Sequence, residues 1–421
     1  MLLLLLTTLV TAGDTWTEFR GPRGDGRALD CRPALRWDAE TNVTWSTPVP
    51  GKGWSSPVVI DREAWLTTAS EDGRILSALA LDLDDGRVLW QKDLFTVDQP
   101  AEIHAFNSHA SPTPAVDERH AYLSWGSAGL VAVDRASREI VWTRTDLKCD
   151  HYRGPGSSPV LHDGRLLLHY DGYDLQYVVC LDTETGETLW RRDRPPNFGS
   201  DDGDRLKAYA TPRVLTPDDG VAETTVVSQT SFGVFGLRLS DGEELWRVRT
   251  DRFSPAGRPV FAAVNNEPRL FVTSGFGKGA VVAIDPRGNG DATETHRLWT
   301  ATRAMPSKPS PVYHAGHLYC VSDNGVLTRL DATTGDVTAQ RRLGGNYSAS
   351  PLLVSGEGGD AVLVVSDEAG ETHVVTADEA LTVVATSTLP AGMLASPVPD
   401  DDGLLLRTRT GVTRIGPAVE G

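Results

Sequence analysis

The feature that most constrains this chain is a unit of about 50 residues that recurs along its length. Each unit opens with a small or polar residue, then Pro, then mostly apolar residues. Successive prolines lie 40 to 55 residues apart, a period that matches a four-stranded propeller blade and exceeds that of ankyrin or tetratricopeptide units. The eight openings are Ser56-Pro57, Ser111-Pro112, Ser158-Pro159, Thr211-Pro212, Arg258-Pro259, Ser310-Pro311, Ser350-Pro351 and Ser396-Pro397.

A second motif follows within most units and reads apolar-Asp, a Gly turn, then apolar-Trp. Its clearest copy runs from Leu181-Asp182 through Gly186 to Leu189-Trp190. This pattern indicates two short strands joined by a turn, in which Gly adopts a positive φ and Asp accepts backbone N–H groups. A Trp that recurs at one register is expected to pack between blades rather than to stack on a ligand. These residues are Trp90, Trp142, Trp190, Trp246 and Trp299.

The two ends of the chain predict how the ring closes. The last unit ends before any Trp strand, whereas a spare strand with a Trp, residues 42–49, precedes the first unit. We therefore predict an all-β fold: an eight-bladed β-propeller of four-stranded antiparallel blades over residues 40–416, with the last blade closed by an N-terminal strand. Such closure pairs sheet edges that otherwise invite aggregation.

The residues before the propeller divide into two parts. Residues 1–12 are mostly apolar, too few to span a bilayer, and end in small residues, which is typical of a secretory signal. Residues 13–39 are expected to form an N-terminal extension. We therefore expect export to the periplasm or cell envelope. No transmembrane anchor is expected, and no Cys directly follows the apolar run as a lipid anchor would require.

The net charge of −17 argues against nucleic acid as a partner, because binding to phosphates requires clustered Lys and Arg. The four cysteines show no CxxC spacing, and the ten histidines are scattered, so no metal site is expected. Buried, inert thiols are the simplest interpretation, and a Cys31–Cys149 disulfide in an oxidising compartment remains the alternative.

The repeat resembles the quinoprotein-like (PQQ-like repeat) β-propeller family, whose units carry Ala-x-Asp-x-x-Thr-Gly-x-x-x-Trp. The resemblance covers residues 40–416 and includes an exported bacterial subgroup similar to the outer-membrane-assembly propeller lipoprotein. Alcohol dehydrogenases of this family use a disulfide between adjacent cysteines and a calcium cluster. This sequence has no Cys-Cys pair and no CxxCH haem motif.

The resemblance therefore implies a non-enzymatic exported binding or scaffold propeller, without cofactor or catalytic residues, that makes protein–protein contacts in the cell envelope. Two alternatives stay open: a quinoprotein-type cofactor-binding dehydrogenase and a polysaccharide-binding propeller. We expect a monomer, although the sequence carries no direct signal of oligomeric state.

Candidate binding residues come from the segments just before each Pro, since these segments should approach the central channel. They are rich in aromatic, amide and cationic side chains for an acidic chain. We hypothesise that they ring one channel mouth and bind a protein partner or another polar or anionic ligand; the alternative is that they form structural turns. The candidates are Asn107, His109, His151, Arg153, Lys207, Tyr209, Lys308, Asn346 and Tyr347.

Overall fold

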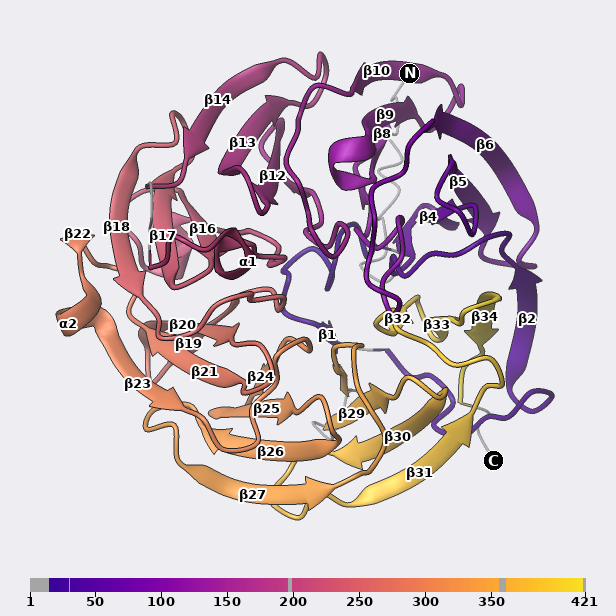
Figure 1. Cartoon of the computed structure of the whole chain (residues 1–421). Coiled ribbons are helices and arrows are strands. Elements are labelled where there is room, and N and C mark those ends of the chain that lie inside the picture. Colours follow the sequence, from indigo (N-terminus) through magenta and orange to yellow (C-terminus); the bar gives the residue numbers. More distant parts are fainter. Residues whose placement is uncertain (1–14, 30, 196–198, 356–360, 419–421) are drawn as a thin grey trace, which may run out of the picture.

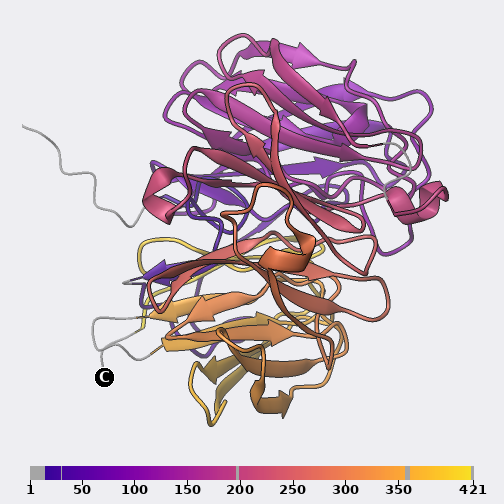
Figure 2. The same cartoon turned by 90° about the vertical axis from the view of Figure 1, so that its left-hand side faces the viewer.

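Eight antiparallel sheets surround one central axis in the computed structural model, which describes residues 15–29, 31–195, 199–355 and 361–418 (Figure 1). Seen from the side, the loops between strands gather on the two faces of the ring (Figure 2). The predicted eight-bladed all-β propeller is thereby confirmed. The predicted signal segment, residues 1–12, lies outside the described residues. Among the described residues, no helix has the length and apolar character that a membrane crossing requires.

Each blade is numbered here by its order along the chain, and its strands run from the channel outward. Blade 1 contains β3 (Val58–Ile60), β4 (Glu63–Ala69), β5 (Ile75–Asp82) and β6 (Val88–Thr96). Blade 2 contains β7 (Ala115–Val116), β8 (His120–Ser124), β9 (Leu130–Asp134) and β10 (Ile140–Arg144). Blade 3 contains β11 (Val160–His162), β12 (Arg165–Asp171), β13 (Gln176–Asp182) and β14 (Thr188–Asp193). Blade 4 contains β15 (Arg213–Leu215), β16 (Thr225–Thr230), β17 (Gly233–Arg238) and β18 (Glu244–Arg249).

The second half of the ring repeats this order. Blade 5 contains β19 (Val260–Val264), β20 (Glu267–Ser274), β21 (Ala280–Ile284) and β23 (Arg297–Ala301). Blade 6 contains β24 (Val312–His314), β25 (His317–Val321), β26 (Val326–Asp331) and β27 (Val337–Arg342). Blade 7 contains β28 (Leu352–Ser355), β29 (Ala361–Ser366), β30 (Glu371–Thr376) and β31 (Val383–Thr388). Blade 8 contains β32 (Val398–Pro399), β33 (Leu404–Arg407), β34 (Gly411–Ile415) and β2 (Val43–Pro48). The short helices are η1 (Gly126–Ala128), α1 (Gly203–Leu206), η2 (Pro217–Asp219) and α2 (Thr293–His296).

Blade 8 closes the ring as predicted. Its outermost strand is β2, which pairs antiparallel with β34 from the other end of the chain. Two blades also gain a fifth strand that the repeat does not predict. In blade 7, β1 (Arg27–Leu29) pairs parallel with the innermost strand β28, and in blade 4, β22 (Gly290–Asp291) pairs parallel with the outermost strand β18. The insertion before Trp299 thus hooks blade 5 onto the edge of its neighbour.

The recurring Trp joins one blade to the next at the outer part of the ring. The Trp190 indole of blade 3 donates to the Leu239 carbonyl of blade 4 at 2.8 Å and lies against Gly242. A Cβ at Gly242 would come within 2.5 Å of the ring, and φ there is +72°. Gly242 is therefore required for two reasons: the turn needs a positive φ, and the Trp190 indole leaves no space for a Cβ. The equivalent indole bonds are Trp45 to Leu83, Trp142 to Thr183 and Trp299 to Ala332.

The junction between blades 1 and 2 uses a different contact, because Arg138 replaces the turn Gly. Arg138 adopts φ of +65°, and its guanidinium stacks 5.0 Å from the Trp65 ring and pairs with Glu63. Trp90 packs against Trp65 with ring centroids 5.5 Å apart. At this junction, Arg138 and Trp65 thus pack beside Trp90. A single indole packs directly against the Gly of the turn at the junctions formed by Trp45, Trp142, Trp190 and Trp299.

The residue before each unit's Pro joins the blades at the channel. At seven of the eight junctions, its backbone N–H donates to the hydroxyl of the equivalent residue in the next blade, at 2.9–3.1 Å. The last of these bonds runs from Ser396 to Ser56 and closes the circle. The ring positions, each two residues before an innermost strand, are Ser56, Thr113, Ser158, Thr211, Arg258, Ser310, Ser350 and Ser396.

This ring corrects the predicted opening of blade 2. Thr113-Pro114, not Ser111-Pro112, occupies the ring position, since Thr113 accepts from Ser56 and donates to Ser158. The two dipeptides stand side by side in the sequence, so spacing alone selected the wrong one. Ser111 instead donates to the Asn107 side chain in the loop above the ring.

All four cysteines are buried and free. The Cys31 thiol donates to the Asp400 carbonyl in blade 8, whereas Cys149 lies beside His151 between blades 2 and 3. The alternative of a Cys31–Cys149 disulfide is therefore wrong. Burial raises the pKa of both thiols to about 12, which keeps them protonated and unreactive.

We expect Trp190→Ala to lower the free energy of unfolding by about 3 kcal/mol or more, because it leaves a cavity between blades and strips the Leu239 carbonyl of its donor. Denaturant titration followed by circular dichroism measures this loss. The control is Leu189→Ala on the same strand, whose side chain is 48% exposed and whose loss we expect to stay within about 0.5 kcal/mol. Equal losses in the two variants would contradict the wedge role of the indole.

Acid should destabilise the fold partly through His169, which is buried on β12. Its Nδ1 lies 2.8 Å from the Ala210 carbonyl and its Nε2 lies 2.8 Å from the Ser228 hydroxyl, partners that a neutral ring satisfies. Burial, reinforced by the nearby Arg194 charge, lowers the pKa of His169 to about 4. In the unfolded chain the pKa is about 6.5.

Between those two values the unfolded state binds the extra proton, so stability falls as pH is lowered from about 6.5 towards about 4. We expect His169→Gln to flatten the dependence of unfolding free energy on pH in this window. The measurement is a series of denaturation curves across it. An identical slope in the variant and the wild type would refute the assignment.

Candidate functional site

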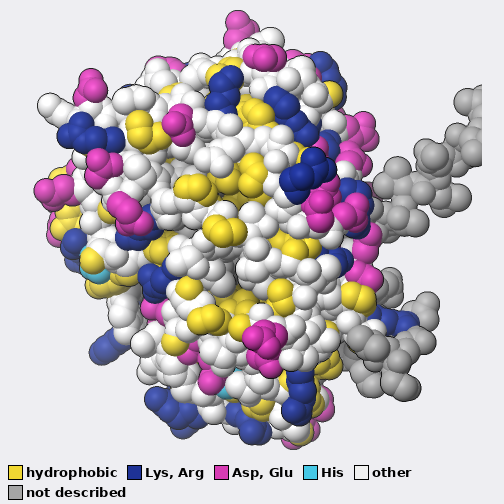
Figure 3. Space-filling model, turned by 90° about the vertical axis from the view of Figure 1, so that its right-hand side faces the viewer, with side chains coloured by type: hydrophobic (Ala, Val, Ile, Leu, Met, Phe, Trp, Pro, Cys, Tyr) yellow, Lys and Arg dark blue, Asp and Glu magenta, His cyan; other side chains and the backbone are white. Residues whose placement is uncertain are grey.

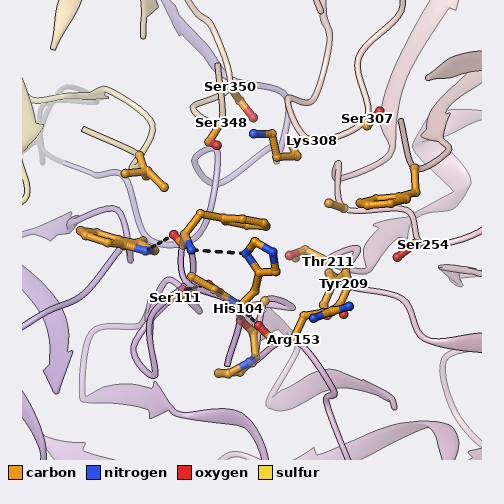
Figure 4. A pocket seen from close by; sticks show the side chains of 18 of the residues that line it. His104, Ser111, Arg153, Tyr209, Thr211, Ser254, Ser307, Lys308, Ser348 and Ser350 are labelled. Carbon is orange, nitrogen blue, oxygen red and sulfur yellow. Dashed lines mark hydrogen bonds between the residues drawn. The ribbon is translucent and has the colours of Figure 1, made fainter. Parts of the chain in front are cut away.

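The channel opens on one face into a cavity of about 660 Å³. It collects side chains from the loops that precede the innermost strands, and Figure 4 shows His104, Arg153, Tyr209 and Lys308 around it. The volume lies within the range of about 300–1,000 Å³ typical of ligand sites. Loops from most of the blades meet here because every innermost strand starts at this face.

The N-terminal segment closes the far end of the cavity. Trp16 exchanges two backbone bonds with Val59 of blade 1, and Val116 of blade 2 donates to the Thr17 carbonyl at 2.8 Å. Further along, the Leu353 amide of blade 7 donates to Gly26 at 2.9 Å. The indigo segment in Figure 1 therefore crosses the centre of the ring, and its Phe19 side chain lines the cavity floor.

Buried charges hold this segment in place. Glu18 pairs with Arg258 of blade 5 at 2.6 Å, and its other oxygen accepts from the Leu161 amide of blade 3. Arg20 donates to the Pro311 and Pro351 carbonyls of blades 6 and 7. Arg258 occupies the ring position at which the other seven blades carry Ser or Thr. It has no hydroxyl to accept the Thr211 amide, so the ring of amide-to-hydroxyl bonds is interrupted at the junction between blades 4 and 5. The Arg258 side chain instead donates to the Pro212 carbonyl of blade 4 at 3.1 Å and pairs with Glu18, so it links blades 4 and 5 and also anchors the N-terminal segment.

Around Phe19, hydroxyls of the ring positions form the rest of the cavity floor. Each accepts an N–H from the preceding blade, and among the described residues none of them donates its own O–H to a protein acceptor. A ligand tip that reaches the floor therefore meets hydroxyl groups with a free donor. Those that line the cavity are Ser56, Thr113, Ser158, Thr211, Ser350 and Ser396.

The walls are aromatic and were only partly predicted. Phe106 is 46% exposed and packs against His104 in a tilted arrangement, with ring centroids 4.4 Å apart. Trp54 donates its indole N–H to the Phe106 carbonyl at 2.9 Å. Phe253 and Phe276 line the opposite wall, with centroids 6.4 Å apart. Nothing in the repeat marks Trp54, Phe253 or Phe276, because they lie in loops that differ from blade to blade.

Five of the nine predicted site residues line the cavity: Asn107, Arg153, Lys207, Tyr209 and Lys308. The structure shows that three of them already have strong partners. Lys207 is buried and pairs with Asp204, Lys308 pairs with Glu368 at 2.9 Å, and Asn107 donates to the Arg153 carbonyl at 2.8 Å. Arg153 instead stacks on the Tyr152 ring at 4.4 Å and remains exposed.

The remaining four candidates lie elsewhere. His109 and His151 line a separate, smaller cavity between blades 1 and 2, where the His151 Nε2 accepts the Ser127 N–H at 3.0 Å. Burial lowers the pKa of His151 to about 4. Asn346 is exposed outside the cavity, and Tyr347 is fully buried in the core between blades 6 and 7.

Solved structures with the same fold include a methanol dehydrogenase and a BamB protein. The chain superposes on a europium-containing methanol dehydrogenase with a TM-score of 0.69 at 12% identity, covering 94% of this chain and 90% of the other. It superposes on BamB from Moraxella catarrhalis with a TM-score of 0.59 at 13% identity, covering 88% of this chain and 98% of the other. Identities this low establish the fold alone.

The cavity does not fit a metal-bound quinone cofactor. Its lining carboxylates are Asp204, which is neutralised by Lys207, and Asp323, which accepts the backbone N–H groups of Ser307 and Lys308. Within the described part of the chain, no group of three His, Cys, Asp or Glu side chains is placed to hold a metal ion. A multivalent cation requires several free oxygen ligands, and this donor set does not supply them.

Sequence comparison identifies the family. A curated relative, outer membrane protein assembly factor BamB of Kangiella koreensis, is 31% identical over 137 residues, which is 32% of this chain and 29% of the relative. The match therefore spans less than a third of that protein. The sequence profile of the family described as Outer membrane protein assembly factor BamB matches residues 78–341 and 277–390, and the chain belongs to this family of PQQ-like repeat propellers.

Proposed function

We propose that this protein is a non-enzymatic, exported propeller that binds a protein partner in the cell envelope through the mouth of the channel. One observation carries the proposal: exposed aromatic side chains gather with the exposed Arg153 guanidinium at the mouth of a blind cavity in an acidic protein. The BamB family supports a scaffold role. The predicted N-terminal signal supports export, and one chain forms the complete ring, as a monomer requires.

Phe276 is the most exposed large apolar side chain among the described residues, at 74%. It sits at the tip of the β20–β21 loop between Gly275 and Gly277, whose φ values are +123° and +72°. Such a tight turn presents the phenyl ring to solvent. Aromatic side chains are frequent energetic anchors of protein interfaces, and an exposed Phe at the tip of an ordered loop indicates such a surface.

The side of the ring that carries β2 and β6 differs from the mouth. Figure 3 shows the side that carries β2 and β6, where apolar side chains lie among Lys, Arg, Asp and Glu of both signs. Interleaved charges of this kind keep a surface solvated. The mouth differs because its aromatic residues converge on a concave surface, which buries more apolar area per contact.

We expect the double variant Phe106→Ala/Phe276→Ala to lose partner capture by at least about tenfold, because it removes two anchors at the mouth. Capture is measured by photo-crosslinking from position 104, which also lines the cavity and is unchanged in every variant compared, in intact cells of the native host, followed by mass spectrometry of the adduct. The control is Leu189→Ala/Leu298→Ala, two outer-strand positions that are 48% and 40% exposed.

Both double variants should keep the wild-type melting temperature, which excludes unfolding as the cause of any loss. The proposal fails if the cross-linked adduct forms equally well with Phe106 and Phe276 removed, or if the outer-wall control abolishes it.

A further inference from the structure

We infer that the cavity takes up a tyrosine side chain from an extended, acidic segment of the partner; this inference rests on the proposed function and specifies its ligand. Three observations lead to it: the aromatic walls, the hydroxyl floor, and the charge around the rim.

The walls suit an aromatic ring. Trp54 and Phe106 form one side and Phe253 the other, all partly exposed towards the cavity. Aromatic rings in such a setting prefer edge-to-face or offset contacts with another aromatic ring. The cavity of about 660 Å³ exceeds what one side chain requires, so it also admits the backbone on either side of the inserted residue.

The floor suits a polar tip on that ring. Beyond the aromatic walls lie the ring hydroxyls, such as Thr113 and Ser158, whose O–H groups donate to no described protein acceptor. A phenolic hydroxyl donates and accepts hydrogen bonds, so it matches these groups, whereas a Phe ring would leave them unpaired. An apolar body with a polar end describes tyrosine.

The rim suits carboxylates beside the inserted residue. Lys52 and Arg409 lie over the Trp54 ring at 5.5 and 5.3 Å, and Arg153 stacks on Tyr152. None of these three forms an ion pair with a described carboxylate, in contrast to Lys207 and Lys308. The rest of the chain is strongly acidic and repels an acidic segment, so electrostatic attraction directs such a segment to the mouth.

The test uses a short fluorescent peptide in which one Tyr stands between two pairs of Glu in a Gly-Ser background, with binding followed by fluorescence anisotropy. We expect replacement of Tyr by Ala to weaken binding by about 30-fold, the loss of a hot-spot anchor. Replacement by Phe should weaken it by about fivefold, the loss of a hydroxyl's hydrogen bonds. Replacement of the four Glu by Lys should abolish binding at low ionic strength.

Matched protein variants locate the peptide. Phe106→Ala should weaken binding of the Tyr peptide and leave the weak affinity for the Ala peptide unchanged. A further peptide carries Gln in place of the four Glu, and Arg153→Ala should reduce the preference of the protein for the Glu peptide over this Gln peptide. The controls are Leu189→Ala and Arg119→Ala, which lie outside the cavity lining. Wild-type melting temperatures in all four variants establish that they are folded.

Three results would overturn the inference: equal affinity for the Tyr and Ala peptides, unchanged binding in Phe106→Ala, or displacement of the peptide by a neutral disaccharide that binds more tightly than the peptide does. If capture of the native partner is lost in Phe106→Ala/Phe276→Ala while the peptides show no preference for Tyr or Glu, the proposed function stands and the inference alone fails. Undiminished capture in that double variant refutes the proposed function itself.

Discussion

The structure depends on how each blade attaches to the next, because an isolated four-stranded sheet cannot bury both of its faces. Two contacts make the attachment at different radii. Near the outer edge of the propeller, the Trp190 indole covers the Gly242 turn and donates to the Leu239 carbonyl. Near the axis, an amide such as that of Ser158 donates to the hydroxyl of Thr211 in the next blade. Together they set the angle between neighbouring blades, and repetition of that angle closes the circle.

The inner contact also shapes the site. Hydroxyls that accept an amide from one side present their own O–H groups to the channel, so the structural ring is at the same time a polar cavity floor. The N-terminal segment converts this channel into a blind cavity, with Phe19 at its base and Arg258 as its main tether. Arg258 interrupts the ring of hydroxyl bonds at one junction, where its side chain instead donates to the Pro212 carbonyl of blade 4 and pairs with Glu18 of the N-terminal segment.

The repeat predicts which loops reach the cavity, but it does not predict which of their side chains point into it. Arg153 and Tyr209 precede ring positions and line the cavity, because the start of every innermost strand faces the same side of the ring. Tyr347 precedes a ring position too, yet it is buried in the core between blades. Which way a loop side chain turns depends on its packing neighbours, and one sequence does not reveal those neighbours.

Periodicity by itself determined the number of blades, the Trp wedges and the closing role of residues 43–48, since each follows from a local pattern repeated at fixed spacing. Only the tertiary structure decided that Thr113 and not Ser111 joins the ring, that residues 15–29 seal the channel, and that Lys207 and Lys308 are already paired. The physical reason is range: strand and turn propensities act over a few residues, whereas these contacts join segments far apart along the chain, such as the 240 residues between Glu18 and Arg258, and exist only after the ring has closed.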